Sequence, residues 1–167
     1  MPTATTTHLI TRAHTATHLT NAMLGAIVEI LTHLGLSAKT LLDDWNQWYD
    51  PALRAWIVEG SLASVIVECH RPSGQVEPVF EFPIVYASDG SVELSHRHVA
   101  LARQWVKLTA VPAGTSFKII CQYSGYHTPQ PGWGPGQRAS TAGLRSVTLG
   151  TLAAGPHASA SLRYYTR

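Results

Sequence analysis

The feature that most constrains the fold lies in the last third of the chain, where a proline- and glycine-rich segment precedes two stretches of alternating side chains. The string TPQPGWGPGQ, residues 128–137, holds three prolines and three glycines, which disfavour helix and strand alike. Beyond it, RSVTLGTL (145–152) and HASASLRYY (157–165) alternate in a way that predicts two strands. This alternation argues against a disordered tail, so we expect the chain to return to a sheet after a long connection.

Helical periodicity dominates the first part of the chain. Apolar residues at helical spacing predict a helix over residues 12–34, ended at Gly35. A second helical stretch over 37–60 should restart near Pro51, with Asp50 as its cap. Ser95 can cap a third helix, whose apolar residues up to Leu108 predict that it is largely buried.

Three strands are expected between these helices and the proline-rich segment. The strings SVIVECH (64–70) and VFEFPIVY (79–86) read as a hairpin joined by the turn RPSGQ. Pro83 predicts an edge or a bulge in the second of these strands. A later strand places Phe117, Ile119, Cys121 and Tyr123 on one face. The order of elements predicts a single α+β domain over residues 1–167.

Composition narrows the class of protein. Hydrophobic residues make up 45% of the chain and charged residues 13%, which excludes global disorder. The best apolar run, AMLGAIVEIL, is too short to span a bilayer, so no membrane association is expected. Cys69 and Cys121 lie far apart without a ligand-like repeat, as in reduced proteins, and we expect a cytoplasmic location.

The charges are divided unevenly along the sequence. Every Asp and Glu lies at or before Glu93, and eight basic residues follow it. This division has two explanations: an acidic partner, or basic strands lying against an acidic helical face of the same fold. Aromatic residues among the basic ones keep nucleic-acid binding open as the alternative function, although no recognition-helix or RNP-type signature is present.

No catalytic or metal-binding motif stands out. His14 and His18 have helical i,i+4 spacing but lack the glutamate of a metalloprotease motif. His96 and His98 flank a cation, and Cys69 and His70 are strand neighbours that face opposite sides of the sheet. A phosphate-binding loop and a nucleophile elbow are also missing. We therefore expect no enzyme activity, no metal and no cofactor.

Several strings, in their order and spacing, resemble the bacterial HORMA-domain family, specifically the single-domain proteins found with phage-defence nucleotidyltransferase (CBASS) operons. The resemblance spans nearly the whole chain. The strings are LLDDWNQWYDPALRAWIVEG, ASVIVECHRPSG, FEFPIVY followed by DGS, PGWG, and the ending LRSVTLGTLAAGPHASASLRYYTR.

The resemblance implies a three-helix core packed on a mainly antiparallel sheet, with a C-terminal safety belt that closes over a short closure-motif peptide. The N-terminal segment would be residues 1–13, the core 14–125 and the belt 126–167. The peptide would pair with an edge strand near residues 117–124. The residues expected at the peptide are Phe117, Lys118, Ile119, Ile120, Cys121, Gln122, Tyr123, Trp133, Val147 and Leu149, and those expected at the belt hinge are Gly125, Pro131, Gly132, Gly134 and Gly136.

The resemblance also implies partners. The closed, peptide-bound protein would activate a cGAS/DncV-like nucleotidyltransferase (CD-NTase) in anti-phage defence, and nucleic acid would be a further partner through that enzyme complex. A pachytene-checkpoint-type AAA+ ATPase would engage the N-terminal segment at Thr5, Thr6, Thr7 and His8 and reopen the domain.

Overall fold

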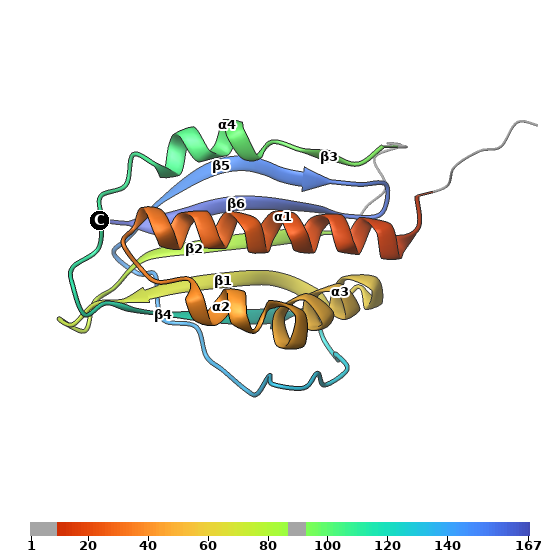
Figure 1. Ribbon diagram of the computed structural model, residues 1–167, viewed down its shortest axis with the longest axis horizontal. Helices are drawn as coiled ribbons and strands as arrows, with labels where there is room; N and C mark the ends of the chain where they lie inside the picture. The colour runs from red at the N-terminus through yellow and green to blue at the C-terminus, as the bar shows by residue number, and fades with distance from the viewer. Residues whose placement is uncertain (1–9, 87–92) are drawn as a thin grey trace, which may run out of the picture.

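A six-stranded sheet covered on one face by helices forms the domain (Figure 1). The computed structural model describes residues 10–86 and 93–167. Every strand pairing in it is antiparallel, which confirms the expected α+β class. The elements, in chain order, are α1 (Arg12–His33), α2 (Lys39–Asp43), the π-helix η1 (Trp45–Tyr49), α3 (Asp50–Glu59), β1 (Leu62–His70), β2 (Val76–Val85), β3 (Ser95–His96), α4 (His98–Trp105), β4 (Ser116–Tyr123), β5 (Arg145–Ala154) and β6 (Ser159–Thr166).

Helix α1 supplies most of the helical face of the core. It begins in a capping box between Thr11 and His14 and ends before Gly35, whose φ of 83° only glycine adopts readily. The prediction of a helix over residues 12–34 is therefore confirmed. Its buried side chains, spaced by three or four residues, lie against the sheet.

The second helical stretch is broken where the proline predicts. Helix α2, η1 and α3 follow one another, and α3 restarts at Asp50 and Pro51. Asp50 is the first residue of α3 rather than its cap, and its carboxylate pairs with Arg54 at 2.8 Å. The wider turn of η1 sets the direction in which Trp48 and Tyr49 project, which matters for the site described below.

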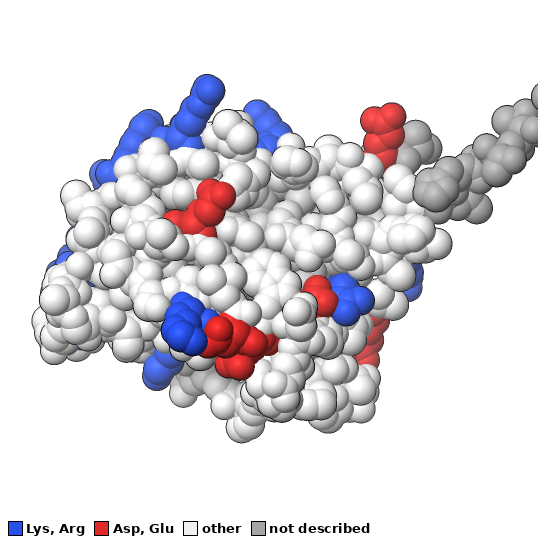
Figure 2. All heavy atoms as spheres, viewed as in Figure 1, with Lys and Arg blue, Asp and Glu red and all other residues white. Residues whose placement is uncertain are grey.

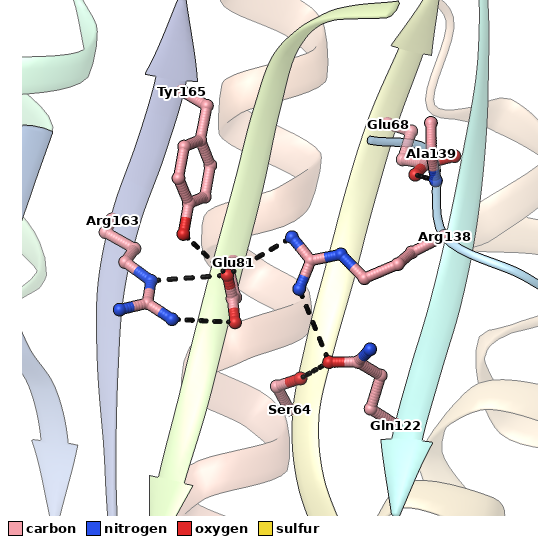
Figure 3. Close-up of polar contacts among 8 residues, drawn as sticks. All are labelled: Ser64, Glu68, Glu81, Gln122, Arg138, Ala139, Arg163 and Tyr165. Carbon is pink, nitrogen blue, oxygen red and sulfur yellow. Dashed lines mark hydrogen bonds and ion pairs between the residues drawn. The ribbon is translucent and has the colours of Figure 1, made fainter. Parts of the chain in front are cut away.

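The strand order decides where the end of the chain runs. The order is β3-β5-β6-β2-β1-β4, so β4 is an edge strand and β6 pairs with β2. The residues between β4 and β5, here called the connecting segment (124–144), must cross from one edge of the sheet toward the other. Residues 127–133 run beside η1 and α3, and residues 138–139 lie on the outer face, the face opposite the helices (Figures 1 and 3).

The sequence predictions for Ser95 and for the helix that follows it are wrong. Ser95 does not cap a helix; it lies in β3 and pairs with Ala154 of β5. Helix α4 is not largely buried, because only Leu101 and Trp105 are buried in it while Val99 stays 67% exposed.

Pro83 lies in a central strand, with neither an edge nor a bulge. The ladder from β2 to β6 is interrupted at Phe82 and Pro83 and resumes in the same register at Ile84. Pro83 has no N–H to donate to the ladder, and the strand accommodates this by leaving two residue pairs without ladder bonds, not by forming a bulge. Within the described residues, no helix is long and apolar enough to cross a membrane.

Candidate functional site: a groove beside strand β4

A groove of about 1350 Å³ lies between the free edge of β4, the π-helix and the connecting segment. Six consecutive residues of β4, Lys118–Tyr123, form its floor, a length of about 20 Å at ~3.3 Å per residue. Trp48, Tyr49 and Trp56 form one wall, and residues of the connecting segment form the roof. The floor of the groove therefore has the length of an extended peptide of about six residues.

The backbone groups that β4 turns toward the groove follow from its pairing with β1. The amide of Ser124 donates to Ser61 O at 2.9 Å. The backbone N–H and C=O groups of the even-numbered residues of β4 therefore point toward β1. The pairing of Ser64 supports this assignment. Ser64 lies opposite Gln122 of β4 and opposite Pro83 of β2, and its backbone groups can bond to only one of these strands. Because Pro83 has no N–H to donate, they bond to Gln122. The amides and carbonyls directed into the groove are those of Phe117, Ile119, Cys121 and Tyr123.

The connecting segment is held at its near end by aromatic residues, here called the aromatic attachment (127–133 on η1 and α3). The indole Nε1 of Trp56, a buried residue, donates to Thr128 O at 2.7 Å, and Trp133 Nε1 donates to Trp48 O at 2.8 Å. Gly132, at φ 84°, lies directly on the indole of Trp48: a Cβ there would come within 2.5 Å of the ring.

The same rings also contact one another. Trp56 packs edge-on against Trp133, with centroids 5.4 Å apart, and against Tyr123, at 4.9 Å. His127 stacks on Tyr123 at 3.4 Å. Glu59 accepts hydrogen bonds from Ser61 and from the amide and hydroxyl of Thr128, and these lower the pKa of its carboxyl. The near end of the segment is thus held by packing and by exposed hydrogen bonds.

The far end is held by buried carboxylates on the outer face, here called the polar attachment (138–139 on Glu68 and Glu81). Figure 3 shows Glu81 between Arg138 of the segment and Arg163 of β6, at 3.4 and 2.9 Å. The Tyr165 hydroxyl donates to Glu81 at 3.2 Å, and the Ala139 amide donates to Glu68.

Glu81 is 4% exposed and stays ionised because of these partners. Burial acts to raise the pKa of Glu81, but the hydrogen bonds and charges of Arg163 and Arg138 outweigh it and hold the pKa below its usual value. Arg138 also donates to Gln122 Oε1, which accepts from Ser64 as well. The polar attachment therefore reaches the floor of the groove through Gln122.

The residues predicted to bind a peptide fall into two groups. Lys118 to Tyr123 and Trp133 line the groove, and Phe117 lies next to its floor. Val147 and Leu149 do not line it: they lie on β5, which β6, β2 and β1 separate from β4, and the prediction for these two is corrected. Periodicity shows which face of a strand is apolar, but not which edge of a sheet the strand joins.

The predicted hinge residues lie in or near the roof. Gly125 and Gly132 have positive φ, whereas Gly134 and Gly136 have open space around them. Pro131 directly precedes Gly132 in the segment. Thr5, Thr6, Thr7 and His8 lie outside the described residues.

The other chemical candidates have structural partners. His14 completes the cap of α1, His18 Nε2 lies 2.6 Å from Ser95 O, and His98 pairs with Glu29. Cys69 is a fully buried core residue, and this burial raises the pKa of its thiol to about 12. The described part of the chain contains no cluster of His, Cys, Asp or Glu that could hold a metal ion.

The basic second half is partly neutralised within the fold. Arg138 and Arg163 pair with Glu81, and Arg167 pairs with Glu77. These acids lie on β2, not on the helical face that the sequence suggested. Other basic side chains remain exposed, including those along α4 (Figure 2).

Sequence reasoning missed the carboxylates of the polar attachment and the aromatic wall of Trp48, Tyr49 and Trp56. Glu68 and Glu81 sit at polar positions of alternating strands, where solvent exposure is the ordinary expectation. The π-helical turn has no sequence signature that we recognised, although the string WNQWY is unusually aromatic.

Several solved structures superpose on this chain. A chain of a mitotic checkpoint complex superposes with a TM-score of 0.70 at 12% identity, covering 89% of this chain and 96% of that one. HTP-2 of C. elegans bound to the HIM-3 closure motif superposes with a TM-score of 0.71 at 15% identity, covering 95% of this chain and 93% of that one. A chain of the E. coli MS115-1 CdnC:HORMA-deltaN complex superposes with a TM-score of 0.59 at 13% identity, covering 98% of this chain and 93% of that one.

In sequence, no curated protein matches the chain. A family model described as Bacterial HORMA domain 2 matches residues 4–167, nearly its full length. The likeness to the solved structures shows the HORMA fold, and the family model shows membership: this chain belongs to the Bacterial HORMA domain 2 family.

Proposed function

We propose that this chain is a signalling adaptor that captures a short peptide as an added strand on β4, under the connecting segment, which acts as the safety belt. The observation that carries the proposal is the free edge of β4, whose alternate backbone groups face a roofed groove of about 1350 Å³. An added strand satisfies such groups whatever its sequence, and the walls select its side chains.

The partner proposed for the captured state is a cGAS/DncV-like nucleotidyltransferase. The likeness to a complex that contains CdnC and a HORMA protein supports this choice. In the proposal the peptide-loaded chain activates the enzyme during anti-phage defence and performs no chemistry itself.

Release of the peptide is proposed to need an AAA+ ATPase that acts on the N-terminal segment. The support is mechanical: the belt is attached on both sides of the groove, so a threaded peptide leaves only after one attachment opens. The C-terminal hairpin cannot simply be removed to test this, because β6 pairs with β2 and its Leu162 is fully buried.

The test uses the full chain and a phage-displayed library of random linear peptides. We expect a family of related peptides to be selected, and one synthetic member to slow hydrogen exchange along β4. That peptide-loaded protein should also stimulate a cGAS/DncV-like nucleotidyltransferase. Selection of no peptide above background would overturn peptide capture, and capture without stimulation would overturn the adaptor role. Retention of DNA or RNA that falls steeply with salt, with no peptide captured, would favour nucleic-acid binding instead.

A further inference from the structure

Asp44 has a carboxylate that the fold does not use. Within residues 10–86 and 93–167, and leaving Glu93 aside, it is the acidic side chain without a hydrogen bond or ion pair. The other acids there have such partners: Glu29, Asp43, Asp50, Glu59, Glu68, Glu77 and Glu81. Asp44 is half-buried and lines the groove, whereas its neighbour Asp43 is exposed and paired with Lys39.

The π-helix fixes Asp44 beside two aromatic residues. The carbonyl of Asp44 accepts from the amide of Trp48 at 2.9 Å and from that of Tyr49 at 3.4 Å, which is the wide turn of η1. All three residues line the groove. Asp44 therefore begins the stretch that carries the aromatic wall, and it lines the groove as a half-buried residue.

The belt completes that wall. Trp133 packs edge-on against Tyr49, with centroids 5.7 Å apart, and donates to the Trp48 carbonyl. Burial raises the pKa of the Tyr49 hydroxyl, and the negative charge of Asp44 adds to the rise, which agrees with an unneutralised carboxylate close to this wall.

Charge and aromaticity together decide which ligand side chain fits. A cation is attracted by ring faces and by a carboxylate, and the stem of lysine or arginine is apolar enough to lie along the rings. An apolar side chain would cover Asp44 without giving it a partner, which is unfavourable. An acidic side chain, or the phosphates of a nucleic acid, would be repelled.

We propose that the groove selects a peptide strand carrying an arginine or lysine at the position that faces η1, held by Asp44, Trp48, Tyr49 and Trp133. This specificity rests on the proposed peptide capture. Lys118 also lines the groove and carries a charge. Its side chain lies on the outer face of β4, because it alternates with Phe117, Ile119 and Cys121, which pack against the core. Because side chains alternate along a strand, the basic position is separate from those that face Lys118.

The experiment is selection from the same random peptide library on the wild type, Asp44→Asn and the matched control Asp43→Asn. Wild type and Asp43→Asn should enrich arginine or lysine at one fixed position, and Asp44→Asn should lose that enrichment. In a selected peptide, replacing arginine by neutral citrulline should weaken binding about tenfold for wild type, the equivalent of ~1.4 kcal/mol, and only about two- to threefold for Asp44→Asn, in which the ring faces alone remain.

The outcomes separate the two proposals. Peptides captured on β4 without a basic preference, or an equal citrulline penalty in wild type and Asp44→Asn, would overturn the specificity and leave peptide capture standing. Capture of no peptide by any of the three proteins would overturn both. Circular dichroism melting of the variants shows whether each is folded.

Discussion

The two attachments of the connecting segment use opposite chemistry on opposite sides of the groove. The aromatic attachment joins rings and indole donors of the helical layer to residues just beyond β4. The polar attachment joins the far end to carboxylates buried on β1 and β2. Packing of rings changes little with acid, and at the near end only the Glu59 hydrogen bonds to Thr128 are acid-sensitive, whereas the polar attachment depends on the ionised carboxylate of Glu81. If the connecting segment acts as the proposed belt, we expect residues 138–139 to detach first and residues 127–133 to be the pivot.

Removal of Glu81 should have the largest effect, because it breaks the polar attachment and the tie between β2 and β6 together. Glu81→Ala leaves Arg138 and Arg163 without their carboxylate, and we expect the free energy of unfolding to fall by about 3–5 kcal/mol. Urea unfolding measures the loss. Glu29→Ala, which breaks an exposed pair with His98, should cost less than about 1 kcal/mol. Equal losses in the two variants would contradict the role given to Glu81.

Gly132→Ala tests the aromatic attachment by a single methyl group. At φ 84° and 2.5 Å from the Trp48 ring, the new Cβ should displace the segment and cost about 1–3 kcal/mol of unfolding free energy. Gly134→Ala, with open space and no positive φ, should stay within about 0.5 kcal/mol of wild type. Chemical denaturation followed by tryptophan fluorescence compares them, and similar behaviour of the two would count against close contact with Trp48.

Arg138→Ala should loosen the far end alone, because Glu81 keeps Arg163 and Tyr165. The free energy of local opening should fall by about 1–2 kcal/mol. Thermolysin cleavage within residues 134–144, which requires this opening, should then be several-fold faster. Arg145→Ala removes an exposed charge at the start of β5 and serves as the control. If both variants are cleaved at the same rate, the polar attachment does not hold the segment.

Acid should weaken the polar attachment by a smaller and graded amount. Because the pKa of Glu81 is lowered in the folded state, its contribution is complete above the ordinary carboxyl pKa of about 4.3 and is lost as pH falls through the folded value. The stability difference between wild type and Glu81→Gln should therefore shrink as urea unfolding is repeated from pH 7 to pH 3. Glu59 contributes with the same sign in both proteins and cancels. A difference that does not change with pH would contradict an ionised Glu81.

The sequence predicts local structure better than it predicts interactions between side chains that lie far apart along the chain. Alternation correctly separates the two faces of β4, and helical spacing together with Pro51 correctly predicts α1 and the restart at α3. The burial of Glu81 depends on Arg138 and Arg163, which lie 57 and 82 residues away, so no local pattern reveals it.

Strand order was the other limit. The hairpin of β5 and β6 could join either edge of a three-stranded sheet with the same alternation, and its pairing with β2 rather than β4 is what leaves the groove edge free. The misplacement of Val147 and Leu149 at the groove follows from that ambiguity.

Residue-resolved amide hydrogen exchange of the full chain, with and without a selected peptide, tests peptide capture on β4 most directly. With the peptide at 100 times its dissociation constant, exchange at Phe117, Ile119, Cys121 and Tyr123 should slow by up to about 100-fold. The amides of Lys118, Ile120 and Gln122 already face β1 and should change much less. Unchanged exchange at the first set while the peptide is bound would contradict the account.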